Sequence, residues 1–223
     1  MNKVIDIITD SFLKILIPGL TRTIPLTIIA FSIALVIGTV VALVQYADIK
    51  GLKQFARFYI WIARGTPLLV QLYVIFFGLP NLGIVIDPFP AAIIVFSLNE
   101  GAYSAETIRG ALESIPKGQI EAGYCVGMNF IQIMYRIALP QAFKVAFPSL
   151  SNSLIAMVKD TSLAANITVT EMFMVTQRIV ARTYKPLVLY MEVGFIYLMI
   201  STILTKVQRS VEKHLNSKGG QRW

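Results

Sequence analysis

The run from Ile24 to Tyr46 contains no Asp, Glu, Lys or Arg, and it constrains the fold more than any other segment. A helix needs about 20 predominantly apolar residues to cross a hydrocarbon core of about 30 Å, and this run is long enough. The whole chain is 56% hydrophobic and only 14% charged, which exceeds the apolar share of a soluble domain. We therefore expect an all-α integral membrane protein.

The hydrophobic pattern divides the chain into one membrane domain, residues 1–223, with about five spans. The expected spans are 24–46, 58–79, 91–111, 145–167 and 187–205. Residues 1–20 place Asp6, Asp10 and Lys14 four residues apart, which predicts an amphipathic helix in the membrane interface. Pro67 is expected to kink the second span. Between the third and fourth spans lies a polar, helix-prone insert, 112–142, and a basic tail occupies 206–223.

The basic residues orient the chain in the membrane. The net charge is +8, and Lys and Arg cluster beside apolar runs, which favours membrane orientation over nucleic-acid binding. Loop 47–64, the insert and the tail hold most of the 20 Lys and Arg residues. The positive-inside rule therefore predicts a cytoplasmic insert, a cytoplasmic C-terminus and an external N-terminus.

Several kinds of chemistry lack the residues they require. The single cysteine, Cys125, excludes an internal disulfide framework and a multi-cysteine metal site. The single histidine, His214, lies in the polar tail, which leaves no histidine-based metal site or triad. The chain also lacks the Gly-rich Lys-Ser/Thr loop that cradles nucleotide phosphates. We therefore expect no enzymatic activity and no cofactor or metal on this chain.

The insert is predicted to be two helices separated by a glycine. Residues 116–126 favour a helix, and Gly127 can adopt the left-handed conformation that ends one. Asn129 and Gln132 have the spacing of a capping box, and Leu139-Pro140 is expected to end the second helix. From the residues alone, this segment could also be an amphipathic loop lying on the membrane.

One face of the first helix of the insert suits contact with a partner. Ala122 and Gly123 are small and would let another protein approach closely, and Glu121 could pair with a partner's Arg or Lys.

The spacing within the insert resembles a family signature. Glu121-Ala122-Gly123, three residues, Gly127, nine residues and Ile137-Ala138-Leu139-Pro140 is similar to the signature of permease subunits of bacterial ABC importers. Gly123 stands where that family usually has Ala. The resemblance implies that this segment is a coupling helix docking on a cytoplasmic ATPase. Its coupling residues would be Glu121, Ala122, Gly123, Gly127, Leu139 and Pro140.

Further segments resemble the polar amino acid branch of that family over about residues 20–210. They are 64–71, 101–110, 114–119, 151–154 and 158–163. The resemblance implies a cytoplasmic ATPase dimer that holds ATP and Mg, and an extracellular or periplasmic substrate-binding protein. It also implies a second permease subunit, expected to be a copy of this chain, in a bacterial inner membrane. Residues 97–99, 159–165 and 171–177 are most similar to cystine-type members, which favours L-cystine over other polar amino acids.

Polar residues at membrane depth are candidates for the substrate pathway. Such residues are costly there and usually mark a pathway or an internal pair. The candidates are Asn99, Glu100, Tyr103, Asn152, Ser153, Lys159 and Asp160. Their charges would complement a zwitterionic amino acid. In the alternative interpretation, Lys159 and Asp160 pair with buried groups and stabilise the packing. Glu106 and Arg109 are expected to be structural, and Arg64 an interfacial anchor.

The alternative function is an ion-coupled secondary transporter or channel working through Glu100 and Asp160. Such proteins usually show inverted repeats and more spans, and neither is visible in this sequence. The leading hypothesis is therefore the permease of an ATP-driven importer, working by alternating access.

Overall fold

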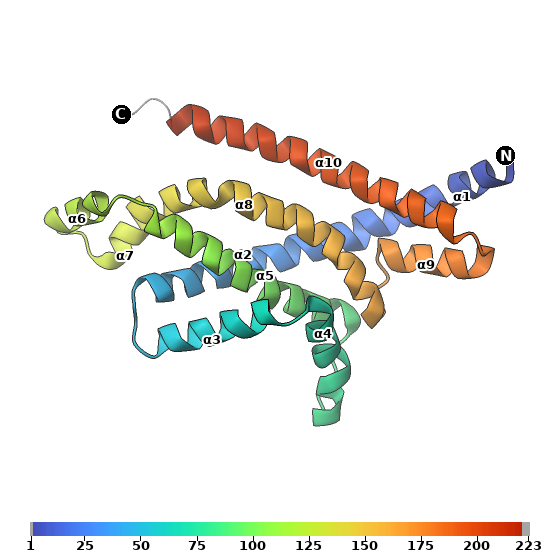
Figure 1. Cartoon of the computed structure of the whole chain (residues 1–223), viewed down its shortest axis with the longest axis horizontal. Helices are drawn as coiled ribbons and strands as arrows, with labels where there is room; N and C mark the ends of the chain where they lie inside the picture. Colours follow the sequence, from blue (N-terminus) through green and yellow to red (C-terminus); the bar gives the residue numbers. More distant parts are fainter. Residues whose placement is uncertain (1, 220–223) are drawn as a thin grey trace. The chain divides into compact units, whose positions relative to one another are not determined.

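The computed structural model describes residues 2–219, and the side chains of residues 5–215. Within these residues the chain forms helices and no strand, which confirms the predicted all-α class (Figure 1). The α-helices are α1 (Asn2–Pro18), α2 (Ile24–Tyr46), α3 (Leu52–Gly65), α4 (Leu68–Tyr73), α5 (Pro88–Glu113), α6 (Lys117–Cys125), α7 (Phe130–Ile133), α8 (Leu139–Asp160), α9 (Met172–Thr183) and α10 (Pro186–Gly219). The tail residues 220–223, with Arg222, lie outside the described part, as does the Lys218 side chain.

Short helices of other pitch join several of these elements. Three are π-helical, namely η1 (Gly19–Thr23), η2 (Val74–Gly78) and η4 (Met134–Ala138), and two are 3-10 helices, η3 (Leu79–Leu82) and η5 (Thr161–Ile167). Each π-helix ends two residues before a proline: Pro25, Pro80 or Pro140. Proline has no N–H and its ring clashes with the carbonyl of residue i−4 in an α-helix. The wider π turn before each proline accommodates the missing hydrogen bond and the proline ring.

This arrangement corrects two predicted boundaries. The expected helix end at Leu139-Pro140 is wrong: the N–H of Leu139 bonds to the carbonyl of Met134, and the helix continues to Asp160. The expected separation between an interfacial helix and the first span is also absent. Ile24 bonds to the carbonyl of Gly19, and the helix runs on from Ile5 to Tyr46. In both places a π-helix ends two residues before a proline, Pro25 or Pro140, and the chain stays helical through that proline.

Two helices within the described residues are long and apolar enough to cross a membrane, Ile5–Tyr46 and Pro186–Leu215. A third is added if Leu52–Gly65 and Leu68–Leu82, which are bent at the break between them, form one span. The predicted break near Pro67 is thus present. The expected spans 91–111 and 145–167 lie on α5 and on α8 with η5, and their membrane crossing stays a prediction.

Packing divides the chain into two units. The first comprises Met1–Ser32, Thr66–Ser97 and Leu154–Val207. Its core includes buried Ile15, Met172, Val193 and Ile196, which bring α1, α9 and α10 together. Gly19 permits a close approach, because a Cβ there would lie 3.0 Å from Sδ of Met172.

The second unit comprises Ile33–Gly65, Leu98–Ser153 and Gln208–Trp223. Its core includes buried Ile60, Ala63, Ala102 and Ala105 from α3 and α5. A Cβ at Gly38 of α2 would lie 2.7 Å from Cβ of Ser104 of α5, so α2 and α5 approach closely at this point. Small residues let helix backbones approach closely in membranes.

Candidate functional site

The first helix of the insert has the predicted form. Helix α6 begins after Pro116, whose backbone is extended, and Val126 follows its last residue. Gly127 has φ of +79°, the left-handed conformation predicted for it. Its N–H donates to the carbonyl of Tyr124 at 3.0 Å, and the N–H of Met128 donates to the carbonyl of Gly123 at 3.0 Å. These bonds satisfy carbonyls at the end of the helix.

The second helix begins with the predicted capping box. The Asn129 side chain accepts from the Gln132 N–H, and the Gln132 side chain accepts from the Asn129 N–H, both at 2.9 Å. These reciprocal bonds fix the point where the chain enters α7.

Gly123 has a different role from the one its size suggested. It is buried, and a Cβ at this position would lie 2.9 Å from Cγ1 of Ile133 and 3.3 Å from Cδ1 of Ile137. Gly123 therefore brings the two helices of the insert together instead of offering a small face to a partner. The side chain of Ala122, next to it, is exposed.

The outer surface of the insert carries large apolar side chains. Tyr124 is 50% exposed, Val126 77%, Ile131 75% and Tyr135 76%. The charged Glu121 lies on the same insert and is exposed as well. We call these five residues the insert surface. Large apolar side chains exposed on a segment that the sequence predicts to face water are typical of a protein-binding site.

The pathway candidates of the second unit hold neighbouring helices. The Asn99 amide donates to the carbonyl of Ala63 at 2.9 Å, and Glu100 accepts from the Ser104 hydroxyl at 3.2 Å. The ring of Tyr103 lies under the guanidinium of Arg64, whose Cζ is 5.1 Å from the ring centroid. On α8, Asn152 accepts from Gln208 of α10 at 3.1 Å, and its neighbour Ser153 is half-buried.

The pathway candidates of the first unit are exposed. Lys159 borders a hollow of about 460 Å³ with Ser162, Tyr190 and Tyr197. Asp160 ends α8, and among the described residues neither Lys159 nor Asp160 forms a salt bridge. The seven candidates are thus divided between the two units, and their placement around one cavity stays a prediction.

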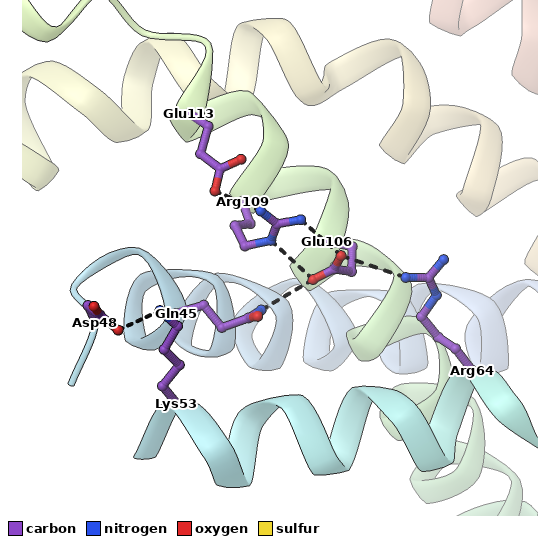
Figure 2. A network of polar contacts seen from close by, with 7 residues as sticks. All are labelled: Gln45, Asp48, Lys53, Arg64, Glu106, Arg109 and Glu113. Carbon is purple, nitrogen blue, oxygen red and sulfur yellow. Dashed lines mark hydrogen bonds and ion pairs between the residues drawn. The ribbon is translucent and has the colours of Figure 1, made fainter. Parts of the chain in front are cut away.

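Glu106 is the centre of a polar network in the second unit (Figure 2). Its carboxylate lies 3.1 Å from Nη2 of Arg109 and 3.8 Å from Nη1 of Arg64, and it accepts from Nε2 of Gln45 at 3.3 Å. Arg109 also binds Glu113 at 2.7 Å. Helices α2, α3 and α5 are joined through one carboxylate, as expected for a structural role of Glu106 and Arg109.

Arg64 differs from its expected role as an interfacial anchor. It lies at the end of α3, binds Glu106 and covers the ring of Tyr103. Both partners are on α5, three residues apart and so on the same face of that helix. Arg64 therefore holds the end of α3, just before the helix break, against the polar side of α5.

Sequence reasoning missed two buried carboxylates in the first unit. Glu171 caps α9, accepting from the N–H groups of Phe173 and Met174 at 2.8 and 2.7 Å and from the Tyr197 hydroxyl at 3.1 Å. Burial raises the pKa of the Glu171 carboxyl, and the two N–H donors oppose that rise. The other is Glu192, which is buried and accepts from the Ser11 hydroxyl at 2.5 Å. Apolar residues recur at helical spacing after Glu171, and this pattern could have predicted α9 with Glu171 as its N-cap.

Comparison with known proteins gives one family. Residues 34–217 match the family model described as "Binding-protein-dependent transport system inner membrane component". The chain is 45% identical to the L-cystine transport system permease protein TcyB of Bacillus subtilis (strain 168), over 95% of this chain and 91% of that protein. It is 35% identical to the L-cystine transport system permease protein TcyL of the same organism, over 89% of this chain and 88% of that one.

Solved structures agree with this result. A crystal structure of an amino acid ABC transporter with histidines aligns with a TM-score of 0.84 at 32% identity, covering 92% of this chain and 96% of that chain. An inward-facing structure of the MetNI methionine ABC transporter aligns with a TM-score of 0.77 at 20% identity, covering 91% of this chain and 97% of that one. The second likeness concerns the fold alone.

Proposed function

The chain belongs to the family of binding-protein-dependent transport system inner membrane components, and on that premise we propose that its insert couples a separate ATPase to L-cystine import. The protein is a multi-pass membrane subunit of an amino acid ABC importer and is not an enzyme. Its family works with an ATPase and a substrate-binding protein. Because the chain belongs to this family, the alternative function, an ion-coupled transporter, is rejected.

The single observation that carries the coupling proposal is the insert surface. The second helix of the insert also carries buried Ile133, Met134 and Ala138, so it is packed on one face while Ile131 and Tyr135 stay exposed. An aqueous segment exposing two tyrosines and two branched aliphatic residues favours burial against a soluble protein. Glu121 adds a carboxylate that could pair with a cation of the ATPase. Gly127, Leu139 and Pro140 shape the segment rather than contact the partner.

The second helix of the insert is continuous with α8, which supports a route by which movement of the ATPase could reach the membrane helices. The chain is helical without interruption from Phe130 through η4 to Asp160. A displacement of the insert by a closing ATPase pair would therefore reach α8 through its first residues, which follow η4 directly. Helix α8 carries Asn152, Ser153, Lys159 and Asp160, four of the pathway candidates. Rocking of this helix would switch the cavity between its two openings.

Substrate, assembly and orientation complete the proposal. Two relatives named as L-cystine permeases, together with the cystine-like runs 159–165 and 171–177, favour L-cystine. Lys159 and Asp160 would meet the carboxylate and ammonium groups of that substrate. Two copies of this chain would form the pathway, with an external N-terminus, a cytoplasmic C-terminus, and ATP and Mg on the ATPase dimer.

The test is transport by the reconstituted complex after removal of one apolar group from the insert surface. Ile131→Ser should weaken ATPase binding about fivefold or more, because truncating a well-packed interface residue costs more than about 1 kcal/mol. ATP-driven uptake should fall with it. The matched control is Val85→Ser, which alters a residue 81% exposed in the loop before α5, on the side expected to be external.

Equal loss of ATPase binding in both variants, or none in Ile131→Ser, would contradict docking at the insert. Competition by unlabelled amino acids in the same vesicles tests the substrate separately. Uptake inhibited by arginine or glutamine and not by L-cystine would reject L-cystine while leaving the coupling proposal intact.

A further inference from the structure

A hollow of about 380 Å³ lies in the second unit where α2, α3 and α5 meet. Lys53, Arg57 and Trp61 line it from α3, four residues apart and so on one face of that helix. Gln45 of α2 and Glu106, Arg109 and Glu113 of α5 complete its polar wall. Figure 2 shows Lys53, Gln45 and Arg109 approaching this region from three helices. The volume is within the range of small-molecule sites.

Among the charged residues that line the hollow, Arg57 alone forms no salt bridge within the described residues, although the charges of Lys53 and Arg57 both lower the pKa of the Asp48 carboxyl. Lys53 bonds to Asp48, and that hydrogen bond lowers the pKa of the Asp48 carboxyl in the loop. Arg109 binds both Glu106 and Glu113. Arg57 is exposed and, within the described part of the chain, forms no salt bridge. The lining itself has three cations, Lys53, Arg57 and Arg109, and two carboxylates, Glu106 and Glu113, so a ligand with a single negative charge would complement it.

The surroundings of Arg57 indicate where that ligand comes from. Trp61 is 71% exposed one turn along α3, and its ring lies 5.9 Å from that of Phe58. Exposed aromatic residues beside Lys and Arg are typical of the membrane–water interface. Arg57 and Trp61 belong to segment 47–64, which the positive-inside rule assigns to the cytoplasm. Anionic lipids of the cytoplasmic leaflet attract basic residues there, and basic pockets between membrane helices bind their headgroups.

We propose that this hollow binds the phosphodiester headgroup of an anionic phospholipid of the cytoplasmic leaflet. Arg57 contacts the phosphate, with Lys53 and Arg109 as further donors at the rim. Trp61 lies against the glycerol and upper acyl region. The site lies apart from the insert surface. The proposal rests on the cytoplasmic placement of loop 47–64 and not on ATPase docking, so the two can fail independently.

The test uses Trp61 as its own reporter in the full-length protein. The chain has two tryptophans, so Trp223→Phe leaves Trp61 as the only one. This protein is reconstituted in bilayers of phosphatidylcholine containing brominated phosphatidylglycerol or brominated phosphatidylcholine, and quenching of Trp61 gives the relative affinity of the two lipids. We expect a preference for the anionic lipid of about fivefold, the factor for one basic residue near an anionic headgroup.

Variants and a soluble anion decide between the outcomes. Arg57→Gln should reduce the preference to about one, whereas Arg57→Lys should retain most of it because the charge remains. Lys50→Gln, which removes an exposed cation of the same loop outside the hollow, should leave the preference unchanged. Equal quenching by the two lipids in the parent protein overturns the proposal. So does a preference abolished by millimolar inorganic phosphate, because the site would then belong to a soluble anion.

Discussion

Replacement of Gly123 by Ala tests whether the close approach of the two insert helices determines the stability of the insert. The added Cβ would lie 2.9 Å from Cγ1 and 3.2 Å from Cδ1 of Ile133, and 3.3 Å from Cδ1 of Ile137. Ile133 is fully buried, so it has little room to move aside. Inserting a methyl group into a packed core costs about 1–3 kcal/mol.

A second effect of the same substitution acts in the opposite direction. Ala is a better helix former than Gly by about 0.5–1 kcal/mol. The net destabilisation of the insert should then be about 0.5–2 kcal/mol. This corresponds to amide exchange about two to thirty times faster across 117–138, if local opening governs exchange there.

Gly118→Ala is the matched control. Gly118 lies on the same helix, and a Cβ there would meet nothing within 4 Å. This variant gains the helix propensity without the clash, so its amides should exchange about two to five times more slowly. Hydrogen exchange followed by mass spectrometry of the assembled, membrane-embedded protein measures both. Slower exchange in Gly123→Ala, matching that of Gly118→Ala, would refute the packing argument.

The remaining predictions concern helix caps in the two units. Asn129→Ala removes one side of the capping box and should weaken the start of α7 by about 1 kcal/mol, which exchange of the Gln132 amide measures; an unchanged rate would show that the box adds nothing. Glu171→Ala should weaken the start of α9 by about 0.5–2 kcal/mol. Glu171→Gln should cost less, because its amide oxygen still accepts one N–H and burial opposes the carboxylate charge. Equal exchange of the Phe173 and Met174 amides in both Glu171 variants would contradict this account.

The predictions made from local spacing were confirmed where the bonds involved are local. The capping box of Asn129 and Gln132 and the left-handed Gly127 depend on residues within a few positions of one another. The C-terminal end of α2 at Tyr46 is the end predicted for the first span, because a polar turn follows it, whereas the helix extends back beyond the predicted start at Ile24. Apolar content likewise determines the all-α membrane class without any tertiary information.

The predictions that failed concern prolines and small residues. Pro140 was expected to end a helix, but a π turn before it keeps the backbone helical into α8. Whether a proline breaks a helix depends on the packing that can support the wider turn, which a sequence pattern does not encode.

The sequence by itself determined that this protein lies in a membrane, exposes a shaped insert and belongs among importer permeases, because hydropathy and motif spacing are properties of the linear chain. Only the tertiary structure decided which groups meet. It turned Gly123 inward against Ile133, joined Arg64 and Arg109 to Glu106, and buried Glu171 beneath Tyr197. Contacts between residues far apart in the chain depend on how helices pack, and the same small or charged residue can serve a partner, a lipid or its own neighbour until that packing is known.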